Sequence, residues 1–236
     1  MGTILKYKGF IAESKKEEYI ERYCKTGDEI PTENRTITSL VDDLKKLNSS
    51  IGYKNTLASI EKGEAAIISV RNKLEIRKKH PEQYVDHLYF IPKNAVKDNI
   101  TIDSFPVTTV PSVAWFDSDV AILNDGEYKY KIGTHTFNSL NKTIPALVPD
   151  SELGPKKINV LRFSEKDDDI ETFDPPKKDI GTGTNFHYGL EPRCVGGYSA
   201  GCQVIPTVEK WNQFWGLVKK SGQKSFWYSI IEKDKI

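Results

Sequence analysis

The spacing of apolar residues along the chain changes near residue 60. Before that point, apolar positions recur every three to four residues, which predicts two helices, over residues 13–27 and 39–47. The first helix would begin at a capping box formed by Ser14 and Glu17. We therefore expect residues 1–60 to form a helical N-terminal extension.

Beyond residue 60 the chain consists of short runs rich in β-branched and aromatic residues, separated by turn formers. This pattern predicts β-strands. The expected strands cover residues 65–70, 88–92, 100–105, 113–115, 128–132, 160–163 and 226–231. Apolar residues at helical spacing predict one further helix from Thr207 to Lys220. The acidic stretch 164–178 is expected to be a solvated loop. The sequence thus predicts a mainly β (α+β) domain over residues 61–236.

The composition narrows the class of partner. The chain has 236 residues, with 34 Lys and Arg against 33 Asp and Glu. This balance argues against nucleic acid, because nucleic-acid-binding proteins usually carry a marked basic excess. No apolar run approaches the roughly 20 residues of a membrane-spanning helix, so we expect no membrane span. Three cysteines are too few, and odd in number, for a disulfide framework.

The residues with catalytic potential gather in one stretch, Gly183-Thr-Asn-Phe-His187-Tyr-Gly189 followed by Gly196-Gly-Tyr-Ser199-Ala-Gly-Cys202-Gln. The thiolate is the nucleophilic form of cysteine, and an imidazole such as His187 can take the thiol proton of Cys202. The backbone N–H groups of Gly201 and Cys202 could then face a developing oxyanion. A second interpretation stays open, in which Cys202 is a small buried core residue and His187 is structural.

Two of these motifs resemble a known family. Ser199-Ala-Gly-Cys202 is similar to the Ser/Thr-His-Gly-Cys signature of L,D-transpeptidase (YkuD-like) catalytic domains, and Asn185-Phe-His187-Tyr-Gly189 resembles the strand that carries their catalytic histidine. Looser similarities extend over residues 64–231 and include Gly133-Thr-His135. The chain departs from the pattern where Ala200 replaces a histidine and Gln203 replaces an aliphatic residue.

The resemblance implies a β-sandwich or barrel and a cysteine enzyme that needs no cofactor and no metal. Cys202 would attack the carbonyl between an L-centre and a D-residue in a peptidoglycan stem peptide. His187 would act as general base and then as general acid. Ser199 and Gly201 would complete the catalytic turn. The side chains expected to contact substrate are His135, Tyr198, Ala200 and Gln203. The acyl-thioester would pass to an amine, as in crosslinking or D-amino acid exchange, or to water, as in an L,D-carboxypeptidase.

Some assignments stay open at this stage. His135 is as well explained as a hydrogen-bonded histidine at a strand end. His80 and His87 lie in a charged stretch and are expected to be solvated. Cys194 is expected to be a bystander thiol, with a disulfide to Cys202 as the alternative. The other functions considered are a non-catalytic wall-binding module that keeps the fold and a phage- or lysis-associated cysteine amidohydrolase.

The expected place of action is the periplasm or the cell wall. The N-terminal residues lack the apolar stretch of a secretory signal. This favours delivery by another route, a stay in the cytoplasm until release, or a signal already removed from this sequence. An antibacterial effector would fit this expectation. Its partners would be an immunity protein or a secretion-system component.

Overall fold

The computed structural model describes residues 21, 24, 33–73, 76, 83–95, 101–112, 121–137, 140–162, 177–190 and 194–236. Its helices are α2 (Ile37–Asn48), α3 (Lys54–Glu61) and α5 (Val208–Ser221), with the short 3-10 helices η5 (Gly196–Tyr198) and η6 (Lys233–Lys235). Its strands are β1 (Arg35–Thr36), β2 (Ala66–Arg71), β3 (Asp86–Ile91), β4 (Thr101–Ile102), β5 (Phe105–Val107), β6 (Ala121–Ile122), β7 (Gly126–Phe137), β8 (Lys142–Ser151), β9 (Gly154–Pro155), β10 (Lys157–Arg162), β11 (Lys177–Thr182), β12 (Phe186–Tyr188), β13 (Gln203–Ile205) and β14 (Ser225–Glu232). The prediction of a mainly β protein is therefore confirmed.

One large sheet organises the molecule, with the strand order β13-β12-β8-β7-β14-β2-β3-β5 and with β9 paired to β8. Its two end strands meet at an isolated bridge between Thr108 and Val204. There, Thr108 N–H donates to the Val204 carbonyl at 3.0 Å and Val204 N–H donates back at 3.2 Å. The bridge closes the sheet on itself, which removes the exposed edges that an open sheet would present. A smaller sheet, β11-β10-β6, lies beside it.

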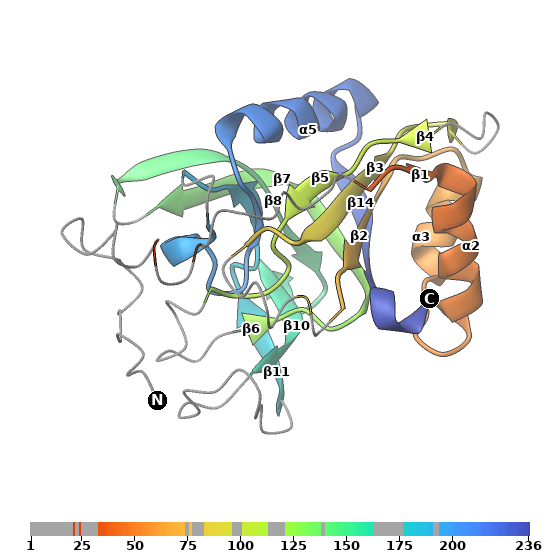
Figure 1. Ribbon diagram of the computed structural model, residues 1–236, viewed down its shortest axis with the longest axis horizontal. Coiled ribbons are helices and arrows are strands. Elements are labelled where there is room, and N and C mark those ends of the chain that lie inside the picture. The colour runs from red at the N-terminus through yellow and green to blue at the C-terminus, as the bar shows by residue number, and fades with distance from the viewer. Residues whose placement is uncertain are drawn as a thin grey trace.

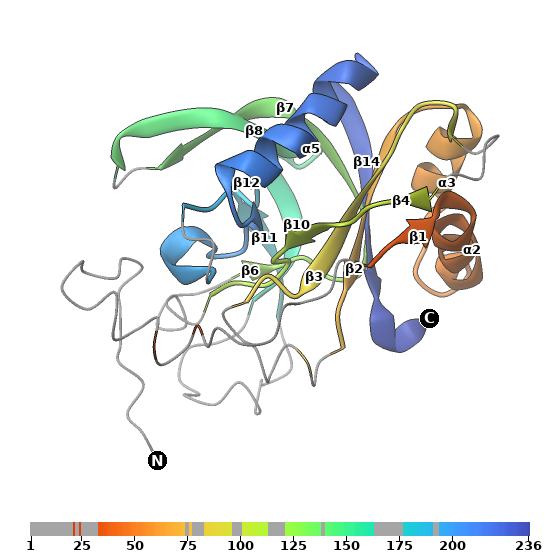
Figure 2. The same cartoon turned by 45° about the horizontal axis from the view of Figure 1, so that its top comes forward.

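Successive side chains along a strand point to opposite faces of the sheet, and here each face has its own apolar core. In β2, Ile67 points into the core inside the closed sheet, whereas Ile68 and Val70 point to the other face. Helix α5 adds Trp211 and Phe214 to the inner core, and it lies across one side of the sheet in both views (Figure 1, Figure 2). Because both faces of β2 are covered, every one of its residues is buried.

Helices α2 and α3 cover the outer face of β2 and β3 (Figure 1). Helix α3 begins where the carboxylate of Glu127, from β7, accepts hydrogen bonds from the backbone N–H groups of Asn55 and Thr56, each at 2.9 Å. A negative charge at a helix N-terminus satisfies unpaired donors and complements the helix dipole. The Tyr53 hydroxyl donates to the Ile230 carbonyl of β14 at 2.7 Å. The helices thus share a core with the sheet.

Most of the predicted elements are present. The helices expected over 39–47 and 207–220 are α2 and α5. Five of the expected strands appear as β2, β3, β7, β10 and β14. The strand expected over 100–105 is divided between β4 and β5. Helix α3 was not predicted. The predicted loop 164–178 is wrong at its end, because Lys177 and Lys178 pair with β10.

The helix predicted over 13–27, apart from residues 21 and 24, and the strand predicted over 113–115 lie outside the described residues. Among the helices that the structure describes, none combines the length and apolar character needed to cross a membrane.

Candidate active site

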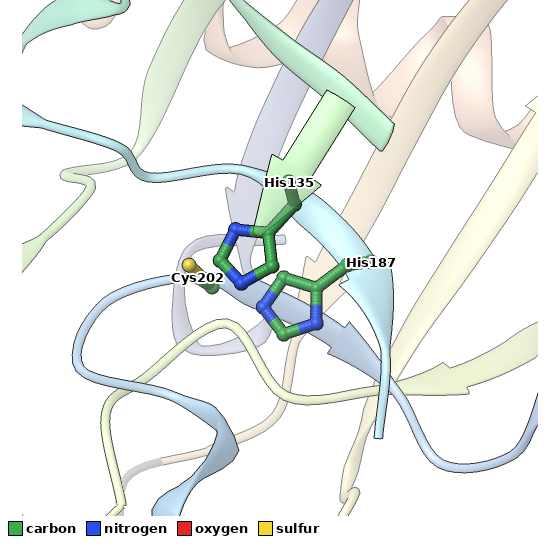
Figure 3. Close-up of side chains that lie close together, drawn as sticks. All are labelled: His135, His187 and Cys202. Carbon is green, nitrogen blue, oxygen red and sulfur yellow. The ribbon is translucent and has the colours of Figure 1, made fainter. Parts of the chain in front are cut away.

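The site forms where β12 and β13 run side by side. The two strands pair in parallel, with His187 opposite Val204, and Cys202 directly precedes β13. His135 reaches the same place from β7. Figure 3 shows the three side chains gathered together, with a ring nitrogen of each histidine on the side facing Cys202. One nitrogen of each histidine and Cys202 Sγ all lie within 4.8 Å of one another. The fold thus joins residues that are 67 positions apart in the sequence.

The two imidazoles stack face to face, with ring centroids 4.1 Å apart and ring planes 13° from parallel. His187 Nδ1 lies 2.9 Å from the Tyr188 carbonyl. Because a carbonyl oxygen only accepts hydrogen bonds, Nδ1 carries the proton and Nε2 presents a lone pair. This Nε2 is buried and has no hydrogen-bond partner among the described residues. The Asn185 amide nitrogen lies 3.0 Å from His135 Nδ1 and orients the second ring.

A tight turn presents Cys202, which is the free cysteine of the chain and is 9% exposed. The Ser199 hydroxyl donates to the Cys202 carbonyl at 2.8 Å and accepts from Gly201 N–H at 3.3 Å. The Cys202 thiol donates to the Gly183 carbonyl at 3.2 Å. Gly201 has a φ of +135°, and a Cβ there would collide with the Ala121 carbonyl oxygen. The turn therefore requires glycine at this position.

Burial keeps the reactive groups neutral. It raises the pKa of the Cys202 thiol to about 11 and lowers the pKa of His187 to about 3. Burial, followed by the charge of Lys156, lowers the pKa of His135 to about 4. Desolvation disfavours the charged form of each group. The resting site at neutral pH is a thiol beside two uncharged imidazoles.

The remaining predicted residues occupy different positions. Ser199 supports the turn from a fully buried position and Ala200 is exposed. Tyr198 is half-buried, with its ring 6.1 Å from that of Phe137. Gln203 was expected to contact substrate. It is instead fully buried, with its amide nitrogen donating to the Gly201 carbonyl at 3.2 Å and its amide oxygen accepting from the Tyr228 hydroxyl at 3.1 Å. Gln203 therefore supports the turn that presents Cys202.

Of the two backbone N–H groups expected to face a developing oxyanion, that of Gly201 already has a hydrogen-bond partner. Gly201 N–H already donates to Ser199 Oγ, so this group is committed to the turn.

Two expectations about neighbouring residues are wrong. Cys194 is neither a bystander nor a partner of Cys202, because it forms a disulfide with Cys24. His87, expected to be solvated, is buried in β3, where its Nδ1 lies 3.2 Å from the Ser104 hydroxyl and its Nε2 lies 3.6 Å from a Glu33 carboxylate oxygen. The charged stretch that suggested exposure ends before β3 begins. His80 lies outside the described residues.

Sequence reasoning missed Asn185. Its backbone carbonyl pairs with Gln203 N–H at 2.9 Å, and its side chain orients His135. Its position two residues before His187 could have marked it, because alternate residues of a strand lie on the same face.

Comparison with protein-family models finds no match. Comparisons with curated proteins and with solved structures also find none. The functional assignment therefore depends on the geometry and chemistry of the site and on the sequence motifs that form it.

Proposed function

We propose that the protein is a cysteine-dependent acyltransferase of the L,D-transpeptidase type that acts on peptidoglycan stem peptides. The observation that carries the proposal is the free Cys202 thiol, held on a tight turn with a nitrogen of His135 and of His187 within 4.8 Å. A thiol beside an unprotonated, oriented imidazole is the arrangement that nucleophilic catalysis by cysteine requires.

His187 is the better general base of the two histidines. Its Nδ1 proton is held by the Tyr188 carbonyl, so its Nε2 lone pair is fixed toward the site. As Cys202 Sγ attacks the substrate carbonyl, the thiol proton passes to His187 Nε2. The protonated imidazole then gives this proton to the leaving amine when the C–N bond breaks, which leaves an acyl-thioester. An acceptor amine or water attacks the thioester next, and His187 takes its proton and returns one to the Cys202 sulfur.

His135 assists this exchange from its stacked position. An imidazolium on His187 would face the uncharged ring of His135 and not a second cation, because the pKa of His135 is lowered to about 4. Asn185 keeps the His135 ring in place. We assign His135 as a positioning residue for His187.

The substrate class depends on the resemblance of the motifs around His187 and Cys202 to L,D-transpeptidase domains. The Cys24–Cys194 disulfide supports a site of action outside the reducing cytosol, which agrees with a substrate in the periplasm or cell wall. An effector delivered to that compartment, with an immunity partner, is one form of this proposal.

The test uses purified tetrapeptide and pentapeptide muropeptides, with and without a D-amino acid acceptor, and mass spectrometry of the products. Crosslinked, exchanged or trimmed products should form with the wild type and be lost with Cys202→Ala. His187→Gln should abolish turnover, whereas His87→Gln, which alters a buried histidine outside the site, should retain it. Full turnover by Cys202→Ala would overturn the proposal. Binding of intact muropeptides without any turnover would instead support a wall-binding module.

A further inference from the structure

We propose that His135, His187 and Cys202 form a zinc-binding site, and that a bound Zn²⁺ ion blocks the Cys202 nucleophile. The binding part of this inference stands on the geometry alone. The inhibitory part rests on the proposed function and identifies a way in which the same site is regulated.

The three side chains are the ligand types that Zn²⁺ prefers. Zinc in proteins takes thiolate and imidazole ligands at about 2.3 Å and about 2.0–2.1 Å, in a tetrahedral arrangement. Ligand atoms around such an ion are separated by about 3.3–3.6 Å. The ligand atoms here are within 4.8 Å of one another before any ion binds. Because the lone pair of each nitrogen lies in its ring plane, zinc binding would require the stacked rings of His135 and His187 to tilt out of their parallel arrangement. This movement would close the remaining distance to the ion and leave a fourth position for water.

The buried His187 nitrogen points independently to a ligand. His187 is 0% exposed, and its Nε2 has no hydrogen-bond partner among the described residues. A buried acceptor without a partner costs free energy, which a metal bond would recover. The Tyr188 carbonyl holds the Nδ1 proton. Zinc-binding histidines commonly have such a carbonyl contact, because it fixes the tautomer that leaves Nε2 free for the ion.

Asn185 provides the matching support for His135. Its amide nitrogen lies 3.0 Å from His135 Nδ1, and its amide oxygen is buried without a partner in the described part of the chain. A half-turn of this amide would bring the oxygen to Nδ1. It would then accept the Nδ1 proton in a hydrogen bond and leave His135 Nε2 as the ligand. The site thus has a supporting contact for each histidine.

Binding would change no oxidation state. Zn²⁺ replaces the proton of the Cys202 thiol, and that proton passes to the solvent. The sulfur lone pairs that would attack a carbonyl are then shared with the ion, so the nucleophile is unavailable until a chelator or a competing ligand removes the metal.

The experiment titrates the full chain, freed of metal and kept without reductant, with Zn²⁺ alone in competition with a chromophoric chelator. Without reductant the Cys24–Cys194 disulfide stays closed, so Cys202 is the one thiol available. We expect one zinc ion per chain. Cys202→Ser, His135→Gln and His187→Gln should each weaken binding at least tenfold, and His87→Gln should leave it unchanged. Absence of saturable binding, or equal affinity in the wild type and Cys202→Ser, would overturn the proposal.

A second readout needs neither a variant nor a substrate. Saturating Zn²⁺ should slow alkylation of wild-type Cys202 by iodoacetamide at least tenfold, measured by mass spectrometry, and a chelator should restore the rate. Unchanged alkylation in zinc would also overturn the inference. Zinc binding without muropeptide turnover would sink the proposed function but keep the metal site. Turnover that is insensitive to saturating zinc would keep the proposed function and overturn the inhibitory part of the inference.

Discussion

Removal of the Cys24–Cys194 disulfide should cost the fold several kcal/mol. The two cysteines are 170 positions apart in the sequence, so the bond closes a very long loop in the unfolded chain. The loop-entropy relation gives about 17 cal/mol/K for a loop of this length, or about 5 kcal/mol at 25 °C. Both cysteines are buried, so the variant Cys24→Ser/Cys194→Ser also exchanges two buried sulfurs for hydroxyls, which adds to the loss.

The assay is reversible unfolding by urea, followed by circular dichroism, of the wild type and the double variant without reductant. The free energy of unfolding should fall by about 5 kcal/mol and Tm by roughly 10–20 °C, since 1 kcal/mol corresponds to about 2–4 °C in a chain of this size. Cys202→Ser, which leaves the disulfide intact, is the matched control. The reasoning is refuted if the double variant unfolds within 1 kcal/mol of the wild type while mass spectrometry finds the wild-type bond formed.

Three further outcomes follow from the same structure. The rate of Cys202 alkylation by iodoacetamide should rise about tenfold per pH unit from pH 7 to pH 10. The reason is that a pKa of about 11 leaves about one thiolate in 10⁴ molecules at pH 7. A rate that levels off near neutral pH would contradict this. Gly201→Ala should lower the free energy of unfolding by about 1–3 kcal/mol in urea because of its positive φ, whereas Gly216→Ala, in open space on α5, should be neutral or stabilising. Glu127→Gln should destabilise the protein by about 1 kcal/mol in thermal unfolding, because α3 loses the charge at its N-terminus.

Much of the fold could be predicted because its signals are local. Apolar residues on both faces of β2 identify a buried strand. Helix α5 has helical spacing, a Thr207 cap that accepts from Lys210 N–H, and Gly222 at its end in the left-handed region. Such features depend on residues a few positions apart. The grouping of His187, Ser199 and Cys202 could be proposed for the same reason, since β12, the turn and β13 follow one another along the chain.

The elements and contacts that the sequence did not predict depend on residues far apart in the chain. Helix α3 has only eight residues, and its N-terminus is satisfied by Glu127, about 70 positions away. No local pattern indicates that contact. The Cys24–Cys194 bond spans a still longer separation. His135 could be flagged by its motif, but its stacking on His187 requires β7, β8 and β12 to lie in order.

The position of β14 has a consequence for how the chain is made. Among the described strands, β14 comes latest in the sequence, yet it lies in the middle of the large sheet, between β7 and β2. During synthesis, the segments before it can form hairpins such as β7–β8. Strands β2 and β7 can be linked through β14 only after residues 225–232 emerge. The partly made chain therefore cannot complete the large sheet until β14 takes its place between β7 and β2.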